Sequence, residues 1–343
     1  YQYLTTYDIH TNQYGFNDSP VTGTGYTFGN SLLTWEKTAI FNVGFDAVLL
    51  NNSVSISSDF FNKYTTDILL TPQTPSTLGG AVSKANIGEM RNTGWEVAVN
   101  YRLNKGEFYH VFGFNIGDSF NKVMKYGDQE IHRADEIERI IREGVPLYSY
   151  YGYKTDGLFQ NEEEIKNSPL PIGAMVQPGD VKYVDRNGDG IIDDNDRYIL
   201  GNAFPRYTYG FTYMLNWKGL DINMLWQGIG KRDMALRGEM IEPYHGSYYY
   251  VMFEHQLDYW SPGNTDAKYP RLVNSSSPSY SNNYSYSSDR NIYDAAYLRL
   301  KNLQIGYTIP EEITQKAKIS KLRLYVTGQN LLTFSANGFI DPE

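Results

Sequence analysis

The stretch of the sequence with the clearest potential for chemistry is residues 185–196, which read Asp-Arg-Asn-Gly-Asp-Gly-Ile-Ile-Asp-Asp-Asn-Asp. Calcium takes about six to eight oxygen ligands, and a twelve-residue loop can supply them from positions 1, 3, 5, 7, 9 and 12. Gly190 stands at position 6, where such a loop turns sharply. The pattern therefore predicts a structural calcium site with these ligands: Asp185, Asn187, Asp189, the backbone carbonyl of Ile191, Asp193 and Asp196.

Two features of this loop differ from an EF-hand. No strong helical pattern flanks it, and position 12 is Asp196, one methylene shorter than Glu, as in the dockerin-like loops that this run resembles. The alternative is a turn rich in Asp and Asn whose side chains accept hydrogen bonds from nearby backbone amides. Five carboxylates within twelve residues would repel one another without a cation. This repulsion favours a bound divalent ion, with calcium ahead of magnesium. Ile192 stands at position 8 of the loop, where an inward apolar anchor is expected.

No other group of residues forms a recognisable catalytic motif. The sequence has no Cys, which excludes disulfides, thiolate catalysis and Cys-ligated metals. None of the five His residues lies in a G-x-S-x-G or H-E-x-x-H context, although His245 and His255 stand in an aromatic-rich region where they could meet a ligand. The tyrosine-dense segments 148–153 and 244–250 suit either stacking on a sugar or peptide, or packing within a loop. We therefore predict that the protein is not an enzyme.

The composition favours strands and turns, with 31 Tyr, 16 Phe, 5 Trp and 31 Gly among 343 residues. The net charge of −9 argues against a nucleic-acid partner, which would require a basic surface. No run of about 18 apolar residues is present, so the sequence contains no candidate transmembrane helix. The mean hydropathy of −0.49 fits a soluble protein and a transmembrane β-barrel equally, because every second strand residue of a barrel faces its lumen.

The periodicity of the strands distinguishes these two classes. Apolar and polar residues alternate over runs of about 10 to 16 residues, and the clearest run places six residues on one face: Tyr207, Tyr209, Phe211, Tyr213, Leu215 and Trp217. The runs pair as hairpins, with turns at 51–52, 105–106 and 218–219 and a short helical piece at 311–319. Soluble strands usually have about 5 to 6 residues, whereas a membrane-spanning strand needs about 9 to 11. Run length therefore favours a membrane barrel, with a large soluble β-sandwich or jelly roll as the alternative.

The connections between hairpins are long, whereas those within hairpins are short. The long ones cover about residues 69–88, 125–205 and 231–295, and the Ser-, Tyr- and Asn-rich run 274–288 is predicted to be an extended surface loop. Outer-membrane barrels have short periplasmic turns and long extracellular loops. We therefore predict an all-β fold that is part of a large antiparallel transmembrane β-barrel, with long extracellular loops where a ligand or partner would bind.

Several motifs follow one another in an order that resembles a known family. They are Trp35-Glu36-Lys37-Thr38, Arg91-Asn92-Thr93-Gly94-Trp95-Glu96, the loop 185–196, Gly201-Asn202-Ala203-Phe204-Pro205-Arg206 and Leu298-Arg299-Leu300-Lys301-Asn302-Leu303. From about residue 34 onward, the chain is similar to the C-terminal half of the SusC/RagA family of TonB-dependent transporters of Bacteroidetes. Because the chain starts at Tyr1 without an initiator Met or a secretory signal, we expect a fragment of such a transporter, without the plug domain.

The resemblance implies an outer-membrane barrel of about 22 strands with a plugged lumen, of which this chain would hold roughly eight or more. It implies contact with outer-membrane lipid, a SusD-like surface lipoprotein as a lid, and energy from the TonB complex acting through the missing N-terminal part. It also implies oligosaccharide or peptide cargo and no catalytic residues. The residues alone leave two other functions open: a calcium-dependent surface glycan-binding or adhesive β-protein, and a secreted β-rich hydrolase.

Overall fold

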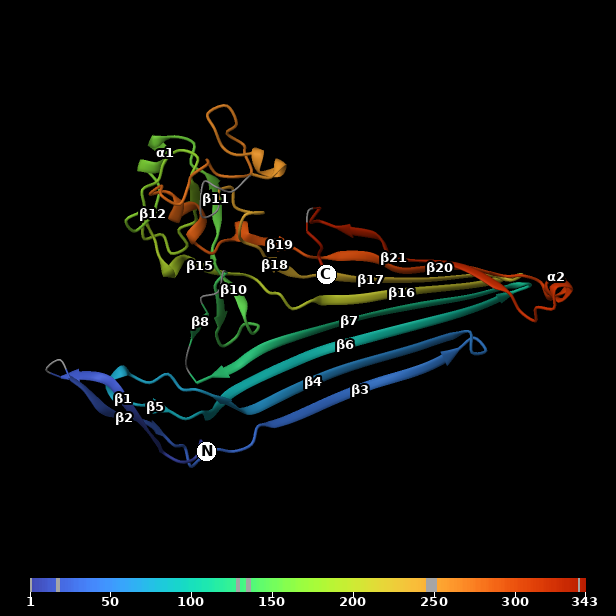
Figure 1. Cartoon of the computed structure of the whole chain (residues 1–343), viewed down its shortest axis with the longest axis horizontal. Coiled ribbons are helices and arrows are strands. Elements are labelled where there is room, and N and C mark those ends of the chain that lie inside the picture. The colour runs from blue at the N-terminus through green and yellow to red at the C-terminus, as the bar shows by residue number, and fades with distance from the viewer. Residues whose placement is uncertain (1, 17–18, 128–129, 134–136, 245–251, 339) are drawn as a thin grey trace.

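The computed structural model describes residues 2–16, 19–127, 130–133, 137–244, 252–338 and 340–343. The eight strands of the largest sheet run side by side along one half of an elongated molecule, and most other segments gather beyond one end of these strands (Figure 1). We call this the loop end and the opposite end the turn end. Among the described residues, no helix is long and apolar enough to cross a membrane.

The eight long strands form one antiparallel sheet in the order β21-β20-β17-β16-β7-β6-β4-β3. Each long strand is hydrogen-bonded to the next long strand along the chain, so the sheet is a meander whose two edges are β3 and β21. The strands contain between 12 and 21 residues, as the long alternating runs predicted. Their bounds are β3 (Lys37–Leu49), β4 (Val54–Leu70), β6 (Ala85–Lys105), β7 (Phe108–Tyr126), β16 (Arg206–Trp217), β17 (Leu220–Lys231), β20 (Tyr297–Thr308) and β21 (Arg323–Ser335).

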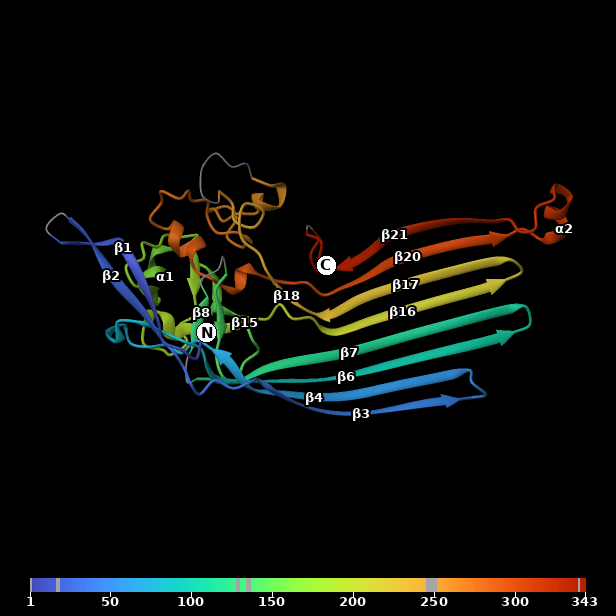
Figure 2. The same cartoon turned by 60° about the horizontal axis from the view of Figure 1, so that its bottom comes forward.

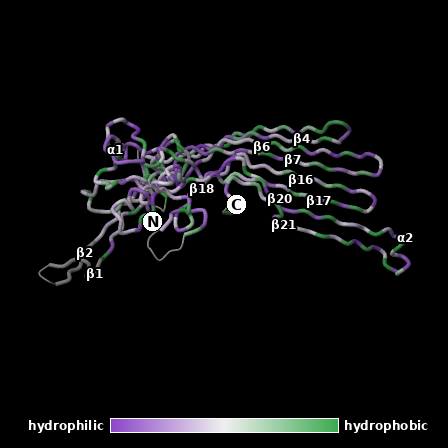
Figure 3. The backbone as a smooth tube through the Cα atoms, turned by 90° about the horizontal axis from the view of Figure 1, so that it is seen from above, coloured by the Kyte–Doolittle hydropathy of each residue, from purple (hydrophilic) through white to green (hydrophobic). Residues whose placement is uncertain are grey.

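One face of this sheet is apolar and uncovered. Phe211 on β16 pairs with Phe114 on β7 and with Trp226 on β17, so the three side chains share this face. Five residues of the face are exposed or half-buried, and none is buried: Phe45, Val97, Phe211, Tyr213 and Ile222. No second sheet lies over these strands in Figures 1 and 2, and hydrophilic and hydrophobic residues alternate along them in Figure 3. The soluble sandwich is therefore wrong, because it requires a covering sheet.

The turn end holds short connections, as the sequence predicted, with small differences in their bounds. Residues 50–53 join β3 to β4, residues 106–107 join β6 to β7 one residue later than predicted, and residues 218–219 join β16 to β17. Asn51 and Asn52 have φ angles of 52° and 64°, and Lys218 and Gly219 have 46° and 87°. Left-handed backbone at both central residues gives a hairpin turn whose twist matches that of the flanking strands. The predicted helical piece is present as α2 (Glu311–Thr314) and η6 (Gln315–Ala317), which join β20 to β21.

The two longest connections, about residues 127–205 and 232–296, fold together into one unit at the loop end, which we call the loop subdomain (Figure 1). Its core contains Trp260 from the second connection together with residues of the first: Tyr153, Leu158, Val181, Tyr183 and Ile192. Its elements are β8 (Ile131–Arg133), β9 (Arg139–Ile141), β10 (Ser149–Tyr153), β11 (Thr155–Leu158), α1 (Glu162–Lys166), β12 (Leu170–Pro171), β13 (Val181–Tyr183), β14 (Ile191–Ile192), η2 (Asp194–Asp196), β15 (Arg197–Gly201), β18 (Asp233–Ala235), η3 (Glu254–Leu257), η4 (Ser281–Ser285), η5 (Asp289–Asn291) and β19 (Ile292–Asp294).

The structure corrects the sequence prediction in two places. The run 274–288 is not an extended surface loop, because Asn282 and Asn283 in η4 are buried and hydrogen-bond to the backbone of Val181 at 2.9 Å each. β13 pairs with β11 along one edge, and these two side-chain amides bond to the backbone of Val181 in place of a second neighbouring strand. A first sheet that the sequence patterns did not predict consists of β1 (Thr6–Phe16), β2 (Ser19–Phe28) and β5 (Ala81–Val82), with η1 (Ser76–Leu78) directly before β5 in the chain.

Candidate functional site

The calcium-type loop 185–196 lies in the loop subdomain between β13 and β15. Ile192 is buried in the shared core, as its position in the loop predicted, and Ile191 is exposed. The short strand β14 inside the loop pairs with β12, which places Ile192 opposite Pro171. One half of the loop is therefore anchored in the core, and the other half carries the polar side chains at the surface.

The carboxylates at the two ends of the loop close it through backbone amides. Asp196 is fully buried, and its Oδ1 accepts hydrogen bonds from the amides of Arg186 at 2.7 Å and Asn187 at 3.3 Å. Asp185 accepts from the amides of Gly190 at 2.9 Å and Gly188 at 2.6 Å. The hydrogen bond from Gly190, followed by that from Gly188, holds the pKa of the Asp185 carboxyl below its ordinary value. The last residue of the loop thus binds the backbone at the start of the loop, and the first residue binds the backbone at its middle.

The remaining predicted ligands also bond to the backbone of the loop. Asn187 Oδ1 accepts from the amide of Asp189 at 3.0 Å, Asp189 Oδ1 from Ile191 at 2.9 Å, and Asp193 Oδ1 from Asn195 at 2.8 Å. Among the described residues, no group of three or more His, Cys, Asp or Glu side chains forms a metal-binding cluster. Each carboxylate has two oxygens with about four lone-pair sites in total, so one amide bond does not exhaust it. The calcium site therefore stays a prediction.

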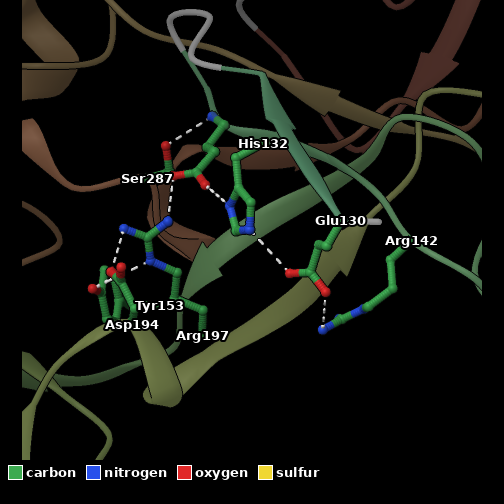
Figure 4. Close-up of polar contacts among 8 residues, drawn as sticks. Glu130, His132, Arg142, Tyr153, Asp194, Arg197 and Ser287 are labelled. Carbon is green, nitrogen blue, oxygen red and sulfur yellow. Dashed lines mark hydrogen bonds and ion pairs between the residues drawn. The ribbon is translucent and has the colours of Figure 1, made fainter. Parts of the chain in front are cut away.

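A polar network connects this loop to the rest of the subdomain (Figure 4). Arg197, which follows the loop directly, pairs with Asp194 at 2.8 Å and with Glu138 at 2.5 Å. Glu138 pairs in turn with Nδ1 of His132 at 2.5 Å, and Nε2 of His132 lies 3.0 Å from Glu130. This network could not be predicted from the sequence, because its members come from β8, β9, β15 and their flanks and meet only when the sheet β15-β10-β9-β8 forms.

The tyrosines and the histidine that the sequence suggested as ligand contacts pack against other parts of the protein wherever the structure describes them. Tyr150, Tyr151 and Tyr153 are buried, which supports loop packing over ligand stacking for segment 148–153. His255 stacks on Phe253 with ring centroids 5.7 Å apart and hydrogen-bonds to the carbonyl of Met240. His245 and most of the segment 244–250 lie outside the described residues.

The polar face of the long sheet carries small and acidic residues. Asp59 on β4 lies directly opposite Glu96 on β6, and the same cross-strand row continues to Gly44 and Gly117. A Cβ atom at Gly44 would lie 2.2 Å from the Asp59 carboxylate, so glycine leaves room for that side chain. The sheet thus has one apolar face and one polar face with space beside its charged groups.

Long antiparallel strands with an uncovered apolar face, short turns at one end and a large loop subdomain at the other define a segment of a membrane-spanning β-barrel. Residues 3–331 match the model of the family described as TonB dependent receptor-like, beta-barrel. The chain belongs to this family, and it is part of a barrel in the outer membrane. The family consists of receptors and not of enzymes.

Comparison with similar proteins supports this family assignment. The chain is 31% identical to TonB-dependent receptor P3 of Formosa agariphila over 95% of this chain and 32% of that protein. It is 26% identical to TonB-dependent receptor SusC of Bacteroides thetaiotaomicron over 100% of this chain and 33% of that protein. A solved structure of the RagAB peptide importer in the open-open state shares the fold, with a TM-score of 0.75, 22% identity, and 98% of this chain and 35% of that chain covered. The SusC/RagA resemblance is confirmed, and the chain spans about a third of the length of these relatives.

Proposed function

We propose that the protein to which this chain belongs imports a nutrient across the outer membrane, driven by the TonB complex through a part outside this chain. The observation that carries the proposal is the sheet with two unlike faces. Its apolar face suits lipid, and its polar face, with Asp59 and Glu96, suits the wall of a lumen that a hydrophilic cargo could pass. The oligosaccharide or peptide class of cargo follows from the family resemblance, because SusC and the RagAB importer are among the similar proteins.

A SusD-like surface lipoprotein is the proposed partner at the loop end. The loop subdomain presents apolar side chains to solvent there, among them Ile172 at 78% and Met175 at 66% exposure. Exposed apolar residues that lie together favour a protein contact over plain solvation. The proposed calcium ion would hold the nearby loop 185–196 with the six predicted ligands and would thus have a structural role.

The test is a growth and uptake experiment in the source bacterium. A strain that lacks the gene is compared with the wild type and with a strain whose TonB complex is disabled, on labelled oligosaccharides and peptides. The proposal expects both mutants to lose uptake of the same cargo. If instead the deletion abolishes calcium-dependent attachment to glycan and leaves all uptake unchanged, the surface glycan-binding or adhesive alternative is correct.

A further inference from the structure

The longest connection at the turn end joins β20 to β21 through residues 309–322, which we call the turn-end link. The other three connections there consist only of residues 50–53, 106–107 and 218–219. The link contains α2 and η6 and projects beyond the long sheet (Figure 1). A hairpin needs only about two residues to turn, so most of this segment is not required for pairing β20 with β21.

A row of aromatic side chains crosses the apolar face of the sheet at the foot of the link. Phe108 lies opposite Trp217, and the two rings stack with their centroids 5.2 Å apart. Trp217 lies opposite Leu220, which lies opposite Tyr307 on β20. Aromatic residues on the outer face of a membrane barrel gather at the membrane–water boundary. Because the link begins two residues after Tyr307, it starts at this boundary.

Exposed apolar residues continue from this row into the link. The amide of Ile309 donates to the carbonyl of Leu322 at 2.9 Å, which extends the pairing of the two strands past the aromatic row. Beyond this point, Ile313 and Ile319 are 59% and 40% exposed. The amide of Ile319 donates to the carbonyl of Thr314 at 3.1 Å, so the second isoleucine lies beside the turn that carries the first. The apolar surface of the sheet therefore leads directly into the link.

The part of the link after α2 is basic, although the chain as a whole has a net charge of −9. Lys316, Lys318 and Lys321 are all exposed, and none of them pairs with a carboxylate of the described residues. The two acids of the link, Glu311 and Glu312, stand together in the first turn of α2. The link thus has separate acidic and basic parts, and the basic part contains one of the two exposed isoleucines.

We propose that the turn-end link is an interfacial anchor that binds anionic phospholipids of the adjacent leaflet. Ile313 and Ile319 would lie among the lipid headgroups, and the three lysines would contact their negative charges. Segments with this combination bind membrane surfaces through apolar burial together with attraction to anionic lipid. A lipid surface is the partner that fits best, because the lipid-facing side of the sheet leads directly into the link. The inference goes beyond nutrient import and does not depend on it.

Hydrogen exchange of the purified whole protein in lipid nanodiscs tests the anchor. Nanodiscs of phosphatidylcholine are compared with nanodiscs that also contain the anionic lipid phosphatidylglycerol. Each lysine close to an anionic surface strengthens binding by about fivefold, so we expect the amides of residues 311–321 to exchange about fivefold or more slowly with the anionic lipid. Exchange in β13 of the loop subdomain should not change. High salt should reduce the difference, because it screens charges at the membrane surface.

Two charge variants of similar side-chain size connect the effect to the lysines. Lys316→Gln combined with Lys318→Gln and Lys321→Gln should remove the difference between the two lipids. Glu312→Gln neutralises a charge of the opposite sign in the same link and should enlarge the difference. Unchanged exchange in the long sheet shows that each variant is folded.

The isoleucines are tested by Ile313→Ser combined with Ile319→Ser, which should accelerate exchange of the link in both lipids because apolar contact with the leaflet is lost. The proposal is overturned if the link exchanges as fast as a solvated loop in both lipids, since it would then lie in water. Equal protection in both lipids and in every variant also overturns it, since another part of the protein would then cover the link. None of these readouts measures uptake, so a failure here is distinguishable from a failure of the import function.

Discussion

Arg271 and Asp180 form an ion pair that joins the two long connections, with Nε of Arg271 2.8 Å from Oδ1 of Asp180. Asp180 is fully buried and also accepts hydrogen bonds from the amide of Gln177 at 2.8 Å and from Nδ2 of Asn283 at 2.9 Å. Asp180 directly precedes β13, whose Val181 and Tyr183 belong to the shared core. A contact between residues 91 positions apart thus holds together two segments that the sequence presents as separate loops.

Replacing this arginine should loosen the loop subdomain. Arg271→Ala leaves the buried carboxylate of Asp180 without its counter-ion, and such a loss costs about 3 to 5 kcal/mol. Hydrogen exchange measured by mass spectrometry should show faster exchange in β11 and β13, with the long sheet unchanged. Lys166→Ala, at an exposed position of α1, is the control and should have no effect. Equal protection in the two variants would contradict a role for the ion pair.

Calcium should stabilise the loop subdomain if the loop 185–196 binds it. A ligand at about 100 times its dissociation constant adds about 2.7 kcal/mol to the free energy of unfolding. Addition of calcium after chelator treatment should therefore slow hydrogen exchange around Ile192, and Asp189→Ala should remove this response. Asp194→Ala, at a position outside the predicted ligand set, should keep it. If calcium changes nothing in the wild type, the loop is a turn held by its own amide bonds.

Acid should open the same loop. Hydrogen bonds from Gly190 and Gly188 lower the pKa of Asp185 in the folded protein, so this carboxylate contributes stability above its unfolded value of about 3.9. The contribution is lost as the pH falls from that value through the folded pKa. The amide protons of Gly188 and Gly190 should thus lose protection in this range, as measured by hydrogen exchange without calcium at a series of pH values. Asp185→Asn should show weaker protection with little dependence on pH, and an unchanged profile would refute the assignment.

A charge on the apolar face of the long sheet should impair the barrel. Val97 stands on the lipid-facing side of β6, and an arginine near the middle of the membrane costs about 2 to 4 kcal/mol. Val97→Arg should reduce the fraction of heat-modifiable, folded protein on gels of outer-membrane extracts. Asn100→Arg places the same charge on the opposite face of the same strand and should be tolerated. Equal folding of the two variants would mean that the two faces are not distinguished by lipid.

The sequence by itself determined the strands and hairpins of the long sheet, whereas the pairings β7–β16 and β17–β20 join strands on either side of the long connections. Strand residues alternate with period two, and each hairpin pairs neighbours along the chain, so the pattern from Tyr207 to Trp217 and its turn at Lys218 and Gly219 suffice to place β16 beside β17. The inward position of Ile192 was also predictable, because it depends on spacing within twelve residues. Local sequence encodes these features since their contacts lie close in the chain.

Only the tertiary structure decided how the loops are arranged. The ion pair of Asp180 with Arg271, the contact of Arg197 with Glu138 and the buried amides of Asn282 and Asn283 join residues about 60 to 100 positions apart. Such contacts follow no period, and polar residues that bond inside a folded loop have the same composition as those that face water. The sequence could therefore show which segments form the barrel wall, whereas the loop subdomain depends on packing between distant segments.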